Sequence, residues 1–275
     1  MNVNLLLIPT LVTALLLFVV GQRSVRCCQS RKRQLGVSAL WLLLGIPGLL
    51  LPLYYLHGFD DAKWFYEFRS FPFSELSAAG VGLFAGALAE LAKGTKLISR
   101  PFLIALLVLG IAAPHLKSIL APVPASQFTD RWKDDICLQS TSSSCGAASA
   151  ASIFRSFGES LSEHDIAKAC LTSISGTENW YIARAFRQRG FAVQYRIETG
   201  FPADLKTPAI AGVRMGDLGH FIAIMDKRDG QYVIGDPLVG RENIFADEIA
   251  KKFDFTGFFM EIQKEGVHEV SRGVP

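Results

Sequence analysis

The sequence lacks the short motifs that mark several large classes of proteins. Its five cysteines include no Cys-x-x-Cys pair, which argues against a zinc ribbon and against a thioredoxin-type redox site. No Gly-x-x-x-x-Gly-Lys-Ser/Thr segment occurs, so no P-loop nucleotide site is expected. The formal net charge is only +3, too small to indicate a nucleic-acid-binding surface. We therefore expect no metal, no cofactor and no nucleic-acid partner.

What the sequence has in excess is apolar residues, which make up 50% of the chain. Before residue 122 they gather in four runs, at about residues 4–20, 36–56, 78–92 and 101–121. A helix needs roughly 20 apolar residues to cross the hydrocarbon core of a membrane. Residues 1–121 are therefore predicted to form a region of four transmembrane helices that anchors the protein in the lipid bilayer. The run 78–92 is the weakest, because it is short and contains Glu90, and a buried core helix is the alternative for it.

The charges of the loops predict how these helices cross the membrane. The loop 21–35 has five basic residues and no acidic one, and three further basic residues lie within 93–100. The loop 57–77 has four acidic residues against two basic ones. Because basic loops stay in the cytoplasm, we expect the loop 57–77 and the residues after 122 to lie outside. If the run 78–92 does not cross, three spans remain and the second half lies in the cytoplasm.

The second half has the composition of a globular domain. A linker is expected at 122–129, the domain at 130–265 and a tail at 266–275. Small and apolar residues after Cys145 predict a buried helix, Ser162 and Asp165 form a capping box before another, and residues 179–189 have helical spacing. Strands are predicted at 192–197, 209–213, 220–225, 232–235 and 258–262, with a hairpin turn at Asp229-Gly230. The domain is therefore predicted to be α+β.

Four residues of this domain have the chemistry of a thiol hydrolase. Cys145 lies in the first turn of its predicted helix, where the helix dipole and the free N–H groups favour a thiolate. His220 begins one strand of the predicted hairpin and Asp236 ends the other, so antiparallel pairing brings the carboxylate to the imidazole. Gln139 is the candidate oxyanion donor. Singly, these residues are explained as a core cysteine, a core histidine and a turn residue, but together they favour a catalytic site.

The same segments resemble a known family. Gln139-Ser-Thr-Ser-Ser-Ser-Cys145-Gly-Ala-Ala is similar to the Gln-x4-Asp-Cys-Gly-x-Ala signature of the bacteriocin-processing, double-glycine leader peptidases. The Gly-His-Phe segment around His220 and the Gly-Asp-Pro segment around Asp236 are similar to that family's His and Asp-Pro segments. The resemblance implies a papain-like cysteine peptidase with Cys145 as nucleophile, His220 as base, Asp236 as orienting acid and Gln139 as oxyanion donor. It also implies a peptide or protein substrate and a neighbouring exporter.

The sequence departs from the family pattern in three ways. Ser144 replaces the Asp that commonly precedes the Cys, no ATP-binding cassette follows, and the domain is C-terminal and expected outside. In the transporter-linked members the domain is N-terminal and cytoplasmic. The expected function is a membrane-anchored cysteine peptidase of a bacterial cell membrane. The alternatives are a catalytically inactive papain-like peptide-binding module and another thiol acyl-transfer enzyme, such as an amidase or a transglutaminase-like protein.

Overall fold

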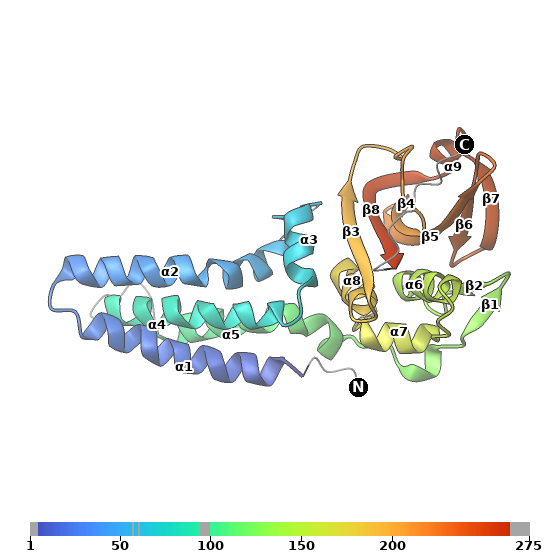
Figure 1. The fold of residues 1–275 in the computed structure, drawn as a ribbon. Helices are drawn as coiled ribbons and strands as arrows, with labels where there is room; N and C mark the ends of the chain where they lie inside the picture. The colour runs from blue at the N-terminus through green and yellow to red at the C-terminus, as the bar shows by residue number, and fades with distance from the viewer. Residues whose placement is uncertain (1–4, 57, 60, 94–99, 265–275) are drawn as a thin grey trace. The chain divides into compact units, whose positions relative to one another are not determined.

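The computed structural model describes residues 5–56, 58, 59, 61–93 and 100–264 of the chain. It divides into two compact units. Unit 1 consists of Met1–Asp60 and Phe71–Ala121 and is helical, whereas unit 2 consists of Asp61–Ser70 and Pro122–Pro275 and is α+β (Figure 1). The α+β class predicted for the second half is therefore confirmed.

Each of the four apolar runs of unit 1 contributes a helix. These are α1 (Leu7–Arg26), α2 (Arg31–Tyr54), the 3-10 helix η1 (Ser74–Gly80) continued by α4 (Val81–Leu91), and α5 (Arg100–Leu120). Among the described residues, α1 and α2 are each long and apolar enough to cross a membrane. A third candidate arises only if α3 (Lys63–Ser70) and residues 74–91, which are bent by 98° at their junction, are taken together. The prediction of four spans is thus supported for two helices and at most three.

Small residues let α1 and α4 approach until their backbones touch. A Cβ atom placed on Gly82 would lie 2.2 Å from the carbonyl oxygen of Ala14, and one on Gly86 would lie 2.0 Å from that of Phe18. The two helices run in the same direction, since Ala14 lies opposite Gly82 and Phe18 opposite Gly86. At their C-terminal ends Arg26 pairs with Glu90 at 3.2 Å. Such close packing through glycine is typical of helices in a membrane.

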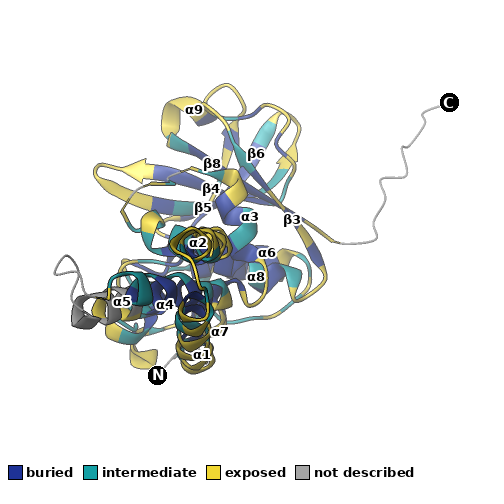
Figure 2. Cartoon of the chain, turned by 90° about the vertical axis from the view of Figure 1, so that its left-hand side faces the viewer, coloured by how far each residue is buried: buried dark blue, intermediate teal, exposed yellow. Residues whose placement is uncertain are grey.

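The outer faces of α1 and α2 are apolar and exposed. Leucines such as Leu15, Leu16 and Leu43 are each at least 60% exposed, and Figure 2 shows these two helices as largely exposed. In a soluble protein so much exposed aliphatic surface would favour association or membrane contact. The helices therefore have the surface expected of a membrane anchor.

Unit 2 is built on an antiparallel sheet of six strands in the order β3-β8-β4-β5-β6-β7. The strands are β3 (Phe191–Ile197), β4 (Ala209–Met215), β5 (Leu218–Arg228), β6 (Gln231–Asp236), β7 (Gly240–Phe245) and β8 (Asp254–Lys264). A separate hairpin joins β1 (Arg131–Lys133) and β2 (Ile136–Leu138), preceded by the 3-10 helix η2 (Ala125–Gln127). The sheet supplies the rigid frame on which the candidate site is placed.

Helices cover one side of the sheet, and an apolar cluster covers the other. The helices are α6 (Cys145–Ser156), α7 (Glu163–Ala169) and α8 (Asn179–Arg187), which lie together in Figure 1. Helix α6 is buried from Cys145 to Phe154 (Figure 2). The other core contains Ile222, Ile224, Tyr232 and Phe259, with the short helix α9 (Ile249–Lys252) beside it. Both faces of the sheet are thus buried, which accounts for the apolar character of its central strands.

Helix α3 belongs to unit 2 although it lies far upstream in the sequence. Phe65 and Tyr66 pack against Trp180 of α8, with ring centroids 6.1 and 6.4 Å apart. The hydroxyl of Ser70 lies 2.7 Å from that of Tyr195 in β3. The sequence had indicated only a loop at residues 57–77, because an eight-residue helix is too short to show a clear periodicity.

Most of the predicted elements of unit 2 are present; the strands are longer than expected, and the helix expected at 179–189 ends at Arg187. All five predicted strands form, and the Ser162 hydroxyl caps α7 by accepting from Asp165 N–H. Asp229 and Gly230 both have positive φ, as a tight hairpin turn requires. Strands β1, β2 and β7 were not predicted, because β1 and β2 have only three residues each and β7 carries charged residues at Arg241 and Glu242. Cys137 and Cys170 are buried free thiols.

Candidate active site

Cys145 is the first residue of helix α6 and is 8% exposed. The helix begins there because Ser144 closes a tight loop in front of it: the Ser144 hydroxyl accepts from Thr141 N–H at 3.0 Å and donates to the Thr141 carbonyl at 3.1 Å. Ser144 thus accepts a backbone hydrogen bond that a carboxylate at this position would also accept. The N–H groups of a first helical turn have no partner within the helix. Cys145 therefore lies where a negative charge on sulfur is favoured.

Two contacts fix α6 against strand β5. The buried Ser149 hydroxyl donates to the carbonyl of Phe221 at 3.1 Å, one residue from His220. Gly146 permits the close approach, since a Cβ atom there would lie 3.1 Å from the Phe221 ring and 3.0 Å from Ile182. Because Ser149 lies one helical turn from Cys145, the hydrogen bond sets the position of the thiol relative to the histidine.

His220 and Asp236 are paired as the hairpin predicted. His220 Nε2 lies 3.0 Å from Asp236 Oδ1, and the two residues are each 7% exposed. The same Oδ1 accepts from the backbone N–H of Leu238 at 2.9 Å, which fixes the carboxylate at the end of β6. Gly235 before it packs closely against β2, because a Cβ atom there would lie 2.7 Å from Ile136 Cδ1 and that side chain would have to shift.

The electrostatics of the pair favour a protonated imidazole. Burial acts to lower the pKa of His220, but hydrogen bonds with Asp236 and Cys145, and the charges of both, outweigh it and raise this pKa to about 9. Burial acts to raise the pKa of Asp236, but hydrogen bonds from His220 and Leu238 N–H hold it below its ordinary value. The imidazole thus interacts with both Cys145 and Asp236. The structure therefore brings together three of the four predicted site residues.

Gln139 is placed next to this group by backbone contacts. Its N–H donates to the carbonyl of Pro237 at 2.9 Å, directly after Asp236, and its side-chain Nε2 donates to the carbonyl of Thr141 at 2.8 Å. The amide must present its NH2 end to Thr141, since an oxygen there would face another acceptor. Its Oε1 is buried and accepts no hydrogen bond from a described residue. The side chain is therefore held by the loop that leads to Cys145.

Sequence reasoning missed the residues that hold the site in place. Ser149 and Ser152 lie on α6 among small residues, and Ser152 accepts from Cys137 N–H at 2.9 Å, which ties β2 to the helix. The signal was present as polar residues recurring inside a buried helix. The run Ser149, Ser152 and Ser156 has helical spacing, so it could have been interpreted as one face directed at backbone partners.

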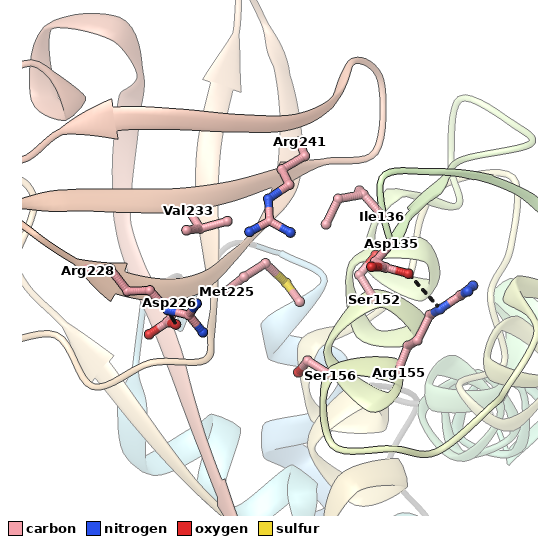
Figure 3. A pocket seen from close by; sticks show the side chains of 10 residues that line it. All are labelled: Asp135, Ile136, Ser152, Arg155, Ser156, Met225, Asp226, Arg228, Val233 and Arg241. Atoms are coloured by element: carbon pink, nitrogen blue, oxygen red, sulfur yellow. Dashed lines mark hydrogen bonds and ion pairs between the residues drawn. The ribbon is translucent and has the colours of Figure 1, made fainter.

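A separate cavity of about 330 Å³ lies at the other end of α6. It is lined by Ser152, Arg155 and Ser156 of the helix and by residues of strands β5 to β7, as Figure 3 shows. Arg155 pairs with Asp135 at 3.3 Å, and Arg228 pairs with Asp226. None of the predicted site residues lines this cavity. Within the described part of the chain, no group of three or more His, Cys, Asp or Glu residues could hold a metal ion.

Comparisons with known proteins agree with the motifs of the sequence. A family model described as "Peptidase C39 family" matches residues 133–266. An uncharacterized protein of the archaeon Methanothermobacter marburgensis is 32% identical over 131 residues, which cover 47% of this chain and 89% of that protein. The "Probable functional amyloid protease FapD" of Pseudomonas aeruginosa is 30% identical over 131 residues, which cover 42% of this chain and 56% of that protein.

Two solved structures are similar in part. The peptidase domain of Streptococcus ComA, a bifunctional ABC transporter involved in quorum sensing, is 24% identical with a TM-score of 0.41, covering 46% of this chain and 96% of that domain. A double-glycine motif protease from an AMS/PCAT transporter, in complex with a leader peptide, is 22% identical with a TM-score of 0.41. That match covers 50% of this chain and 95% of that protease.

Proposed function

This chain belongs to the peptidase C39 family and is a cysteine-type peptidase, and from that premise we propose that Cys145, His220 and Asp236 are its catalytic triad, with Gln139 as oxyanion donor. The observation that carries the proposal is the 3.0 Å hydrogen bond between His220 Nε2 and Asp236 Oδ1, in a site where Asp236 and Cys145 raise the pKa of His220 to about 9. This is the nucleophile, base and orienting acid that thiol hydrolysis requires.

The first half of the reaction is attack by sulfur. The Cys145 thiolate adds to the carbonyl carbon of the scissile peptide bond, and the C=O electron pair moves onto oxygen. The N–H of Cys145, in the first turn of α6, donates to this oxyanion, and so does the second Nε2–H of Gln139, the one that does not bind the Thr141 carbonyl. When the C–N bond breaks, the imidazolium of His220 gives its proton to the leaving amine, and a thioester remains on Cys145.

The second half returns the enzyme to its starting state. His220, now neutral, takes a proton from water as the water oxygen attacks the thioester carbonyl. The C–S bond then breaks, the acid product leaves, and Cys145 is again a thiolate beside an imidazolium. Asp236 stays ionised throughout and holds the ring in the orientation that both proton transfers need.

The test of this assignment uses the full chain in detergent and a random peptide library read by mass spectrometry. We expect new peptide termini with the wild type and with the control Cys137→Ser, and none with Cys145→Ser or His220→Ala. Cleavage that persists in Cys145→Ser would refute the triad. Release of ammonia from Gln or Asn side chains without new termini would indicate an amidase, and retention of peptides without any hydrolysis would indicate a binding module.

We also propose that unit 1 anchors the enzyme through four spans. With about 1.5 Å per α-helical residue and about 2.0 Å per 3-10 residue, η1 and α4 together are about 30 Å long, which matches the hydrocarbon core. Helix α4 runs parallel to α1 through the glycine contacts, and Glu90 pairs with Arg26 at the same end. If α1 crosses the membrane, α4 packs along it and crosses as well.

The number of crossings supports an extracytoplasmic peptidase. Helix α3 follows α2, the rest of unit 2 follows α5, and both belong to one compact unit. They must therefore lie on the same side of the membrane, so α4 and α5 either both cross or both do not. The three-span alternative, in which α5 crosses without α4, would put α3 and residues 122–264 on opposite sides. With the basic loop 21–35 in the cytoplasm, the peptidase lies outside.

Reporter fusions test this location. Alkaline phosphatase is active only after export, so its fusion after residue 265 is expected to be active and a green fluorescent protein fusion at the same point to be dark. The matched control is a fusion after residue 35, inside the basic loop, where the two readouts should be reversed. A dark phosphatase and a bright fluorescent protein after residue 265 would place the enzyme in the cytoplasm.

A further inference from the structure

Glu163 is a buried carboxylate that the proposed reaction does not use. It is the first residue of α7, and its exposed fraction is 0%. Among the described residues no Lys or Arg pairs with it. Burying a carboxylate without a basic partner costs free energy unless hydrogen bonds replace its water. Glu163 is buried despite this cost, so its role is sought in the hydrogen bonds that it makes.

Among the described residues, the side-chain hydrogen bonds of Glu163 all go to Ser140, next to Gln139. Glu163 Oε1 accepts from the Ser140 N–H at 2.8 Å, and Oε2 accepts from the Ser140 hydroxyl. The Ser140 oxygen in turn accepts from Thr129 N–H at 2.9 Å. The backbone of Glu163 is itself fixed, since its N–H donates to Asp130 Oδ1 at 3.1 Å. One carboxylate thus holds the residue between Gln139 and the loop that enters α6.

The neighbouring contacts complete a clamp around the oxyanion donor. Gln139 N–H is bound to Pro237 on one side, and Thr141 N–H is bound to the Ser144 hydroxyl on the other. Ser140 is the middle residue, and Glu163 binds both its N–H and its hydroxyl. Three consecutive backbone N–H groups therefore have fixed partners. These partners lie in three different segments of the chain. Without Glu163 the Ser140 N–H would lose its partner, and only the contacts of Thr129 with the Ser140 hydroxyl would remain.

We propose that Glu163 is a positioning residue, which orients Gln139 toward the oxyanion by holding Ser140. This role rests on the proposed function, since it assumes that Gln139 stabilises the oxyanion on attack by Cys145. Glu163 does not touch the reacting atoms. It acts in the transition state only through Gln139, so its removal slows formation of the oxyanion and leaves the nucleophile intact.

Two reactions of the same thiol separate these effects. Acylation of Cys145 by p-nitrophenyl acetate passes through an oxyanion and releases coloured p-nitrophenolate. Alkylation by iodoacetamide displaces iodide at a saturated carbon and forms no oxyanion. Both are measured on the full chain in detergent, in a background with Cys27→Ser and Cys28→Ser, and the rate of Cys145→Ala is subtracted. A variant that merely loosens the fold changes both rates, whereas a variant that misplaces Gln139 changes the acylation rate alone.

We expect Glu163→Ala to lower the acylation rate about tenfold to a hundredfold, as misplacement of a catalytic group by about 1 Å does. Alkylation should stay within about twofold. Glu163→Gln should lose less, because its amide oxygen still accepts the Ser140 N–H. The matched control is Asp165→Asn, which removes one carboxylate charge from the same helix at an exposed position, and its acylation rate should be unchanged.

A double variant decides whether Glu163 acts through Gln139. If it does, Gln139→Ala together with Glu163→Ala should acylate no more slowly than Gln139→Ala alone, within about twofold. Multiplication of the two losses would overturn the proposal, and so would a parallel fall of alkylation or an equal effect of Asp165→Asn. If Glu163→Ala lowers the acylation rate and Gln139→Ala does not, Glu163 does not act through Gln139. That result would overturn this role but would leave Cys145 as the nucleophile. Wild-type acylation by Cys145→Ala would overturn both the role and the proposed function.

Discussion

Replacing Asp236 with Asn removes the negative charge beside His220 while it keeps the shape of the site. In the structure a single oxygen, Oδ1 of Asp236, lies 3.0 Å from His220 Nε2 and 2.9 Å from Leu238 N. The amide oxygen of Asn can accept both hydrogen bonds. The turn after β6 and the orientation of the imidazole should therefore be retained, and Asp236→Asn isolates the effect of charge.

The size of the effect follows from the balance at the imidazole. Burial acts to lower the pKa of His220, and with Asp236 and Cys145 in place this pKa is raised to about 9. Without the carboxylate, burial is opposed mainly by Cys145. We therefore expect the pKa of His220 to fall to about 6.5, the value of an unperturbed histidine, or below it. At pH 7.5 nearly all wild-type molecules then have an imidazolium, against about a tenth or fewer of the variant molecules.

Two measurements check this expectation. A ¹³C-histidine NMR titration of the full chain in detergent gives the pKa directly, with His220→Gln to assign the resonance. The rate of Cys145 alkylation by iodoacetamide at pH 7.5 should fall about tenfold or more in Asp236→Asn, because the imidazolium that pairs with the thiolate is then scarce. The control Asp229→Asn removes an exposed carboxylate from the turn of the same hairpin. An unchanged midpoint near 9 in Asp236→Asn would refute the electrostatic argument.

Three further outcomes follow from the structure. Iodoacetamide at pH 7.5 should modify Cys145 much faster than Cys170, because burial raises the pKa of Cys170 to about 12. Intact-protein mass spectra measure the two rates, and equal rates would contradict the assignment of Cys145 as the nucleophile. Because the pKa of His220 is higher in the folded state, its contribution to stability is fully present below about pH 6.5 and is lost as the pH rises through about 9. The urea midpoint of unit 2 should therefore fall over that range in the wild type and stay nearly flat in Asp236→Asn, and identical curves would exclude this linkage. Phe65→Ala should destabilise unit 2 by about 3–5 kcal/mol, because it removes a buried aromatic ring. The control Trp64→Ala, at a position 52% exposed, should destabilise it by less than about 1 kcal/mol. Urea titrations followed by tryptophan fluorescence measure both values.

The sequence was sufficient for those parts of the candidate site that depend on chain order and strand pairing. A hairpin turn at Asp229-Gly230 places the start of β5 beside the end of β6, so the contact between His220 and Asp236 could be predicted from the sequence alone. The helix after Cys145 was equally predictable, because small residues followed by apolar ones favour close packing. Both predictions depend only on residues that are close together in the sequence, and the structure contains the predicted hairpin and the predicted helix.

What could not be predicted rests on partners that are distant in the sequence. Nothing near Glu163 indicates that its carboxylate binds Ser140, and nothing near Phe65 indicates that its ring packs against Trp180. Strand β7 lies at the edge of the sheet, where charged residues such as Arg241 and Glu242 are tolerated. These charges interrupt the alternation of apolar and polar residues by which a strand is usually predicted. Such contacts are decided by the tertiary fold and overrule local preference.

The place of α3 in the chain has a consequence for how the protein is made. Tyr66 packs against Phe258, with ring centroids 5.8 Å apart, yet roughly 190 residues separate them in the sequence. At about 5–20 residues per second, a ribosome needs roughly 10 to 40 s to synthesise that stretch. During this time α3 has been released but the strand that completes its binding site does not yet exist. The peptidase therefore finishes folding only after α4 and α5 have been synthesised, so that the helices of the anchor exist before the active enzyme can form.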